Sequence, residues 1–135
     1  MIGKTSMRFA ALCAALASAV PAAVAEEKIP GPVGGAFPPP VVVLTIEGVI
    51  DPVIVRYVQR GYREAARHHA QCLVIQINTP GGLEQSMREI VQETLNSPIP
   101  TIGYVTPKGA RAASAGAFIV LACHLTAMAP GTTMG

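Results

Sequence analysis

The sequence predicts an α/β domain with a mainly parallel sheet that helices flank. Short apolar runs rich in β-branched residues alternate along the chain with longer stretches that place apolar residues three and four positions apart. Such runs are typical of parallel strands buried on both faces, and the longer stretches are typical of amphipathic helices. Right-handed crossovers between parallel strands then place the helices against the faces of the sheet.

The regular pattern begins at residue 41, where a β-branched run over 41–46 predicts the first strand, ended by Gly48. Asp51 can accept hydrogen bonds from the free amides at the start of a helix, and Pro52 suits the first helical position. The sequence therefore predicts a helix from Pro52 to about His69.

Strand and helix continue to alternate over the rest of the chain. Further strands are predicted at 72–77, 101–105 and 125–129, and a helix of small residues is predicted at 112–123. The helix between the second and third strands is expected to bury one apolar face, made of Leu83, Met87, Ile90, Val91 and Leu95.

Length and composition restrict the classes of protein to consider. The 135 residues support one soluble domain, and 50% of them are apolar, which is too many for a disordered chain. Beyond Ala25 eight basic residues balance eight acidic ones, because two of the ten Lys and Arg residues precede it. A neutral domain gives no reason to expect a nucleic-acid partner.

The first 25 residues have the layout of a secretory signal peptide. Lys4 and Arg8 precede an apolar run over 9–20, and small residues at 23–25 suit a cleavage site. As a helix that run would span only about 18 Å, against a hydrocarbon core of roughly 30 Å, so a retained anchor is disfavoured. We expect an exported protein at the periplasmic or extracytoplasmic face of the membrane. Residues 26–40, rich in proline and glycine, are expected to form a linker.

No spacing of cysteine and histidine residues predicts a metal site. His68 and His69 are adjacent and would point to different faces of a helix, and His124 stands alone. Cys72 and Cys123 lie in or beside apolar runs, which favours packed thiols over a disulfide or a metal pair. We expect neither a metal nor a cofactor.

Two loops, each between a strand and a helix, contain the candidate functional residues. The first contains Gly81 and Gly82, whose amides can approach a substrate carbonyl and stay free to donate to the oxyanion of an acyl-transfer reaction. The alternative for a Pro-Gly-Gly sequence is a plain turn before a helix.

The second loop contains Ser114, flanked only by alanine and glycine from 112 to 117. Small neighbours let a peptide backbone reach the hydroxyl, and the start of a helix favours negative charge there. Serine at this position is also a good helix cap. The sequence leaves open whether Ser114 is a nucleophile or a cap.

Three motifs in this order resemble one known family. They are Asn-Thr-Pro-Gly-Gly at 78–82, Gly-Ala-Arg-Ala-Ala-Ser-Ala-Gly at 109–116, and Ala-Met-Ala-Pro-Gly-Thr at 127–132. Together they are similar to the amino-terminal protease domain of NfeD-type membrane-bound serine proteases. The resemblance extends from about 41 to 135 and implies a fold of the ClpP/crotonase superfamily, incomplete at the C-terminus.

The resemblance also implies roles for individual residues. Ser114 matches the nucleophile of a Ser-Lys dyad, and Gly81 and Gly82 match the oxyanion hole. The family's general base is a lysine farther along the chain than this sequence extends, so we expect a partial domain that is inactive alone. Lys108 lies in a polar loop and His124 at the far end of the last helix, which makes both poor substitutes for that lysine.

The family implies an endopeptidase acting on membrane-associated proteins, stomatin-like proteins among them. It also implies membrane association through segments not in this sequence, and the open sheet edge of a partial domain favours a homo-oligomer. Two other functions remain open. One is a crotonase-like acyl-CoA enzyme with the same oxyanion geometry, and the other is a non-catalytic assembly or scaffold module in which Ser114 only caps a helix.

Overall fold

A computed structural model describes residues 38–135. The expected signal peptide and all but the last three residues of the expected linker lie outside the described residues. In chain order the elements are β1 (Val41–Glu47), α1 (Pro52–Arg67), β2 (Cys72–Asn78), α2 (Glu84–Asn96), β3 (Thr101–Val105), β4 (Arg111–Ala112), α3 (Ala115–Ala122), β5 (Leu125–Met128) and β6 (Thr133–Met134).

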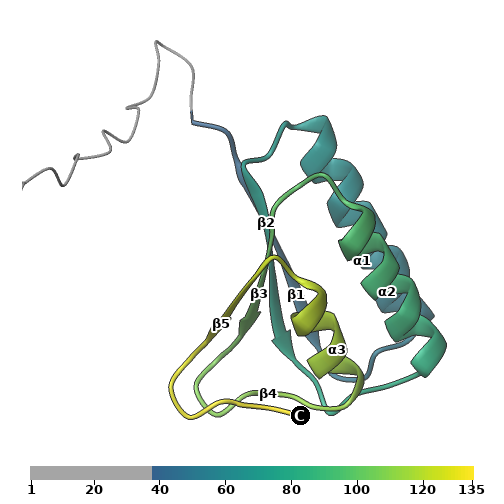
Figure 1. Cartoon of the computed structure of the whole chain (residues 1–135), viewed down its shortest axis with the longest axis vertical. Helices are drawn as coiled ribbons and strands as arrows, with labels where there is room; N and C mark the ends of the chain where they lie inside the picture. Colours follow the sequence, from purple (N-terminus) through teal and green to yellow (C-terminus); the bar gives the residue numbers. More distant parts are fainter. Residues whose placement is uncertain (1–37) are drawn as a thin grey trace, which may run out of the picture. The chain divides into compact units, whose positions relative to one another are not determined.

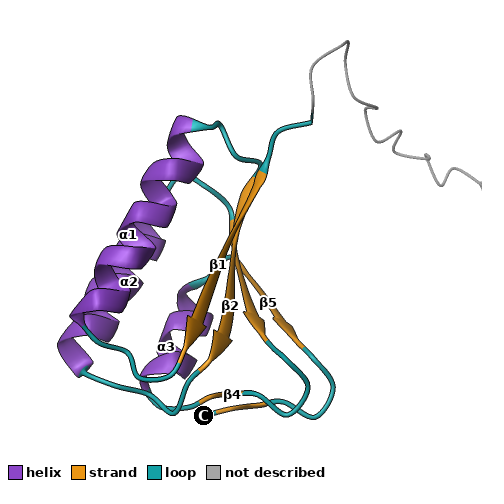
Figure 2. Ribbon diagram, turned by 180° about the vertical axis from the view of Figure 1, so that it is seen from behind, coloured by secondary structure: helices purple, strands orange, loops and turns teal. Residues whose placement is uncertain are grey.

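Four strands form a parallel sheet in the order β1-β2-β3-β5, and the three helices pack on it (Figure 1). The predicted α/β class, the parallel sheet and the positions of its four strands are confirmed. Within the described residues the helices all lie on the same side of the sheet (Figure 2). Each crossover steps to the next strand in the same direction, so crossovers of one hand place every helix on one face.

The strands are therefore not buried on both faces, and that prediction is wrong. In β1, Leu44 and Ile46 are buried, whereas Val41 and Val43 are 49% and 51% exposed. The buried pair faces the helices, and nothing among residues 38–135 covers the opposite face. Continuous apolar character identified the strand correctly but did not show which faces are covered here.

The first helix begins as predicted and ends at Arg67, two residues before the predicted His69. Asp51 caps it, because its Oδ1 atom accepts hydrogen bonds from the amides of Val53 (2.8 Å) and Ile54 (2.9 Å). Pro52 occupies the first helical position, where no amide donor is needed.

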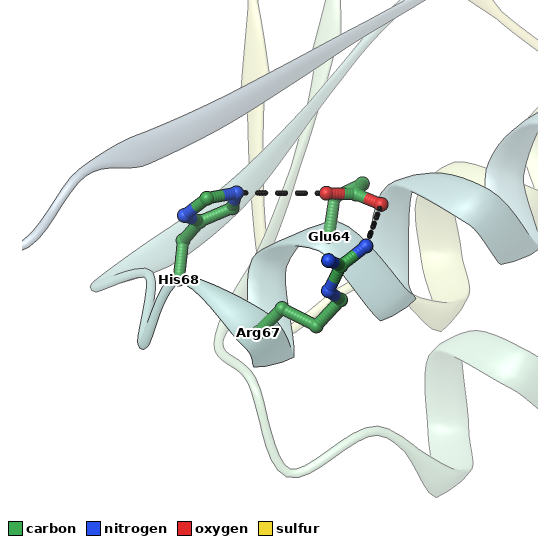
Figure 3. A network of polar contacts seen from close by, with 3 residues as sticks. All are labelled: Glu64, Arg67 and His68. Atoms are coloured by element: carbon green, nitrogen blue, oxygen red, sulfur yellow. Dashed lines mark hydrogen bonds and ion pairs between the residues drawn. The ribbon is translucent and has the colours of Figure 1, made fainter.

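Exposed ion pairs occupy the last turn of α1 (Figure 3). Glu64 lies 3.0 Å from the guanidinium of Arg67 and 3.5 Å from Nε2 of His68. Pairs as exposed as these contribute little to stability. His68 is thus a surface residue.

The second helix is rotated relative to its predicted apolar face. Leu83 and Leu95 are 56% and 64% exposed, whereas Ile90 and Thr94 are buried. Burial of Thr94 is possible because its hydroxyl donates to the Ile90 carbonyl (2.9 Å) and accepts from the Tyr62 hydroxyl (3.0 Å). The buried stripe therefore includes a polar residue that a count of apolar side chains omits.

A small second sheet joins β4 to β6, at positions where the sequence predicts no strand. Arg111 pairs with Thr133, and Ala112 pairs with Met134. Two-residue strands are too short to show a periodicity in the sequence. This sheet fixes the segment just before Ser114.

One main-chain amide of the edge strand β1 is hydrogen-bonded to a side chain. The Thr45 N–H donates to the Tyr57 hydroxyl of α1 at 3.1 Å.

Of the helices in residues 38–135, none combines the length and the apolar character needed to cross a bilayer.

Candidate active site

The two predicted loops meet at the carboxyl ends of the parallel strands. Gly81 follows β2, Ser114 precedes α3, and a Cβ atom placed on Gly81 would lie 2.9 Å from Ser114 Cβ and 3.4 Å from Ser114 Oγ. The loops are far apart in the sequence but in contact in the fold. Ser114 and Gly81, to which the family resemblance gives roles in one active site, are therefore neighbours.

Both glycines are required by the backbone around them. Gly81 has φ +113°, a conformation that other residues rarely adopt. A Cβ on Gly82 would collide with the main chain of Ile50, whose amide donates to the Gly81 carbonyl and whose carbonyl accepts from the Leu83 amide, both at 2.9 Å. These contacts hold the turn against the loop that follows β1.

Only one of the two glycine amides is free. The Gly81 N–H donates to Oγ1 of Thr79 at 3.0 Å, whereas the Gly82 N–H has no acceptor among residues 38–135. The expectation of two free amides is wrong for Gly81, because a threonine hydroxyl two residues earlier folds back onto it. Gly82, which follows the glycine in contact with the serine, retains an unpaired backbone donor.

Ser114 occupies the N-cap position of α3 without acting as a cap. Its side chain is exposed and makes no capping hydrogen bond. Its backbone has φ 50° and ψ −115°, angles of the first central residue of a type II′ turn, where glycine is normally found. The Gly116 amide closes this turn by donating to the Ala113 carbonyl at 2.9 Å. A non-glycine residue held this way stores strain of about 1–3 kcal/mol.

A second free amide lies directly after the serine. The N–H of Ala115, the first residue of α3, has no acceptor within the described part of the chain. Sequence reasoning missed it, although the first amides of any helix lack partners inside the helix. The start of α3 therefore offers an unpaired donor and the positive end of a helix dipole beside the Ser114 hydroxyl.

A groove between α2 and α3 opens at this point and has a volume of about 630 Å³. Its lining combines the site residues with apolar and polar side chains of both helices, namely Gly82, Glu84, Met87, Arg88, Val91, Gln92, Ser114, Ala115 and Phe118. Arg88 is paired with Glu84 on the rim. The groove is large enough for part of an extended peptide, and the serine lines it together with both residues that have a free amide.

No base is positioned to deprotonate Ser114 within residues 38–135. Lys108 is exposed in its loop. His124 is engaged elsewhere, because its Nδ1 accepts from the Thr101 amide (3.1 Å) at the start of β3, the opposite end of the sheet. The Ser114 hydroxyl forms no hydrogen bond with any described residue.

The described cysteines are free and partly buried. Burial raises the pKa of the Cys123 thiol to about 11, and its Sγ donates to the Ile119 carbonyl at 3.3 Å. Residues 38–135 hold no group of three or more potential metal ligands.

Comparison with known families supports the resemblance that the motifs indicate. The family model for the NfeD1b N-terminal domain matches residues 40–135. The chain belongs to the NfeD1b family. Among its curated relatives, membrane-bound protease PH1510 of Pyrococcus horikoshii is 51% identical over 71 residues, which are 53% of this chain and 16% of the relative. Membrane protein NfeD1b of Bacillus subtilis is 36% identical over 95 residues, which are 70% of this chain and 21% of that protein.

Solved structures agree with this NfeD1b assignment. A serine-to-alanine mutant of the 1510-N membrane-bound stomatin-specific protease superposes with a TM-score of 0.71 at 41% identity, covering 74% of this chain and 48% of that one. A lysine-to-alanine mutant of it, in complex with a substrate peptide, gives 0.69 at 44% identity, covering 71% and 44%.

The fold is also similar to that of ClpP. ClpP1 from Listeria monocytogenes superposes with a TM-score of 0.54 at 22% identity, over 60% of this chain and 46% of that one. The expected ClpP/crotonase-like fold is confirmed.

Proposed function

We propose that this NfeD1b domain supplies the nucleophile and the oxyanion hole of a serine-type endopeptidase. One observation carries the proposal: Ser114 is exposed and uncapped, and its strained backbone holds the hydroxyl beside two unpaired amides. A serine that only capped the helix would bond to the amides of its first turn. The protease names of the relatives, and the serine-to-alanine form in which one of them was solved, support the same role.

The proposed reaction begins with attack of Ser114 Oγ on a peptide carbonyl carbon. A bond forms from Oγ to that carbon, and the carbonyl electron pair moves onto oxygen. The resulting oxyanion accepts hydrogen bonds from the Gly82 and Ala115 amides, and one such donor typically lowers the barrier by ~3 kcal/mol. Gly81 lines the hole by letting the loop approach the serine without a side chain. Collapse of the intermediate breaks the C–N bond, the amine leaves with the proton that the base took from Ser114, and an acyl-serine remains for water to hydrolyse.

We assign the base to a lysine outside residues 38–135. A lysine can take the serine proton when burial lowers its pKa to about 7–8. The peptide complex of a relative in which a lysine is replaced by alanine supports such a residue. On this proposal, residues 38–135 do not hydrolyse peptides by themselves.

The proposed substrates are membrane-associated proteins, with stomatin-like proteins as the first to test. A relative is named stomatin-specific and membrane-bound, and the groove beside Ser114 is large enough for part of an extended peptide. We further propose that the full-length protein is exported, faces the periplasm or the extracytoplasmic side, attaches to the membrane through parts other than residues 38–135, and assembles as a homo-oligomer.

Fluorophosphonate labelling of the full-length protein tests the central proposal. The probe should form a covalent bond with Ser114 Oγ and release fluoride, and Ser114→Ala should abolish labelling. Equal labelling of both forms would remove Ser114 from the mechanism. Binding of an acyl-CoA at the same groove would instead favour a thioester substrate.

A further inference from the structure

Thr79 joins the loops around the candidate active site. It directly follows β2 and is fully buried. Its hydroxyl donates to the Gly48 carbonyl (2.6 Å), accepts from the Gly81 amide (3.0 Å) and lies 3.2 Å from the Gly81 carbonyl. The hydroxyl therefore links the loop after β1 to the glycine turn.

The main chain of Thr79 holds the other side of the site. Its amide donates to the Arg111 carbonyl at 2.7 Å, and its carbonyl accepts from the Ala113 amide at 3.1 Å. A Cβ on Gly116 would collide with the Thr79 methyl carbon, so that methyl packs directly against the start of α3. Thr79 thus contacts the glycine turn with its hydroxyl and the serine turn with its backbone and methyl.

We propose that Thr79 is a positioning residue that selects the Gly82 amide, and not the Gly81 amide, as the donor beside Ser114. The inference rests on the proposed function and adds a residue to it. A Gly-Gly pair has more backbone freedom than any other dipeptide, so an external contact must fix the direction of its amides. The Thr79 hydroxyl fixes the first of the two peptides by binding the Gly81 amide. The Ile50 amide holds the second through the Gly81 carbonyl, so the Gly82 amide stays unpaired.

The two functional parts of Thr79 can be separated by substitution. Thr79→Val keeps the methyl against Gly116 and removes the hydroxyl. Thr79→Ser keeps the hydroxyl and removes the methyl. If the hydroxyl positions the turn, the valine variant loses reactivity at Ser114 and the serine variant retains it.

Thr94→Val is the matched control for loss of a buried hydroxyl. Thr94 is also fully buried and its hydroxyl is also bonded twice, but it lies near the far end of α2, roughly 15 Å by helical rise from the start of the helix that follows the glycine turn. It should lower the unfolding temperature much as Thr79→Val does. It should not change the reactivity of Ser114.

The experiment measures the rate of fluorophosphonate labelling against probe concentration in the full-length protein, with an unfolding temperature for each variant. Misplacement of a reacting or stabilising group by about 1 Å commonly costs about 100-fold, so we expect Thr79→Val to slow the maximal labelling rate by roughly 10- to 100-fold. The half-saturating probe concentration should change little. The maximal labelling rate of Thr79→Ser should stay within about threefold of that of the unmodified protein. The rate of Thr94→Val should equal that of the unmodified protein.

Three results would overturn the inference. Thr79→Val could label at the unmodified rate, Thr94→Val could slow labelling equally, or Thr79→Ser could be as slow as Thr79→Val. If Thr79→Val does not fold, the labelling rate of Thr79→Cys is measured in its place and compared in the same way. Its thiol is a weaker donor at the position of the hydroxyl. Labelling of the unmodified protein that does not depend on Ser114 would contradict the proposed function itself, which separates the two failures.

Discussion

Replacing Ser114 by glycine should stabilise the fold while removing the candidate nucleophile. The backbone angles of Ser114, φ 50° and ψ −115°, are sparsely populated for a residue with a side chain, and no capping hydrogen bond offsets the strain. Relief of such strain is worth about 1–3 kcal/mol. Glycine also makes the unfolded chain more flexible, which opposes the gain by about 0.4–1 kcal/mol. We expect the free energy of unfolding to rise by about 0.5–2 kcal/mol.

Ser114→Ala is the matched control, because alanine removes the hydroxyl but keeps Cβ and therefore the strain. Since no capping bond is lost, its free energy of unfolding should stay within about 0.5 kcal/mol of the unmodified value. A serine that did cap the helix would lose about 1 kcal/mol on the same substitution. The two variants thus distinguish strain from capping.

Thermal unfolding of the three proteins provides the assay. In a domain of about 100 residues, 1 kcal/mol corresponds to a change of about 4–8 °C in Tm. The glycine variant should unfold at a higher temperature than both other proteins. A glycine variant no more stable than the alanine variant would show that the backbone is not strained. A loss of about 1 kcal/mol in the alanine variant would identify Ser114 as a cap.

Three further predictions concern other parts of the domain. Asp51→Ala should lower the free energy of unfolding by about 1 kcal/mol in urea denaturation, and Asp51→Asn, which can still cap α1, should lose much less. Gly61→Ala should cost about 1–3 kcal/mol in the same assay, since the added Cβ overlaps the buried Leu44 side chain. Because burial raises the pKa of Cys123 from 9.0 to about 11, the folded protein binds more protons than the unfolded chain between these values. Stability should therefore fall as pH rises from 9 to 11, and Cys123→Ala should weaken that dependence, as measured by denaturation at each pH.

Local signals in the sequence were enough to predict the order of the three helices and of the four strands of the main sheet, but not β4 and β6. The Asp51-Pro52 start of α1 is set by residues next to one another, and the β-branched run of β1 depends on its own composition. The side of α2 that is buried was not predictable in this way, because it depends on a hydroxyl contact between Thr94 and Tyr62 on different helices.

In the candidate site, too, features set by local sequence were predictable and features set by contacts between distant segments were not. Ser114 and the glycine pair were recognisable as candidates because each lies between a strand and a helix, and because the motifs that contain them resemble those of one family. The identity of the two free amides and the role of Thr79 were not predictable, since both depend on contacts between segments far apart in the chain. A buried threonine at the end of a strand has no distinctive pattern of its own.

Because the Thr45 amide of β1 donates to the Tyr57 hydroxyl, the two edges of the sheet differ in how accessible their backbone groups are. A strand arriving beside β1 must first displace that phenol from the backbone, whereas β5 has no comparable side-chain block among residues 38–135. The β5 edge is therefore the one at which a further strand could pair without displacing a side chain of residues 38–135.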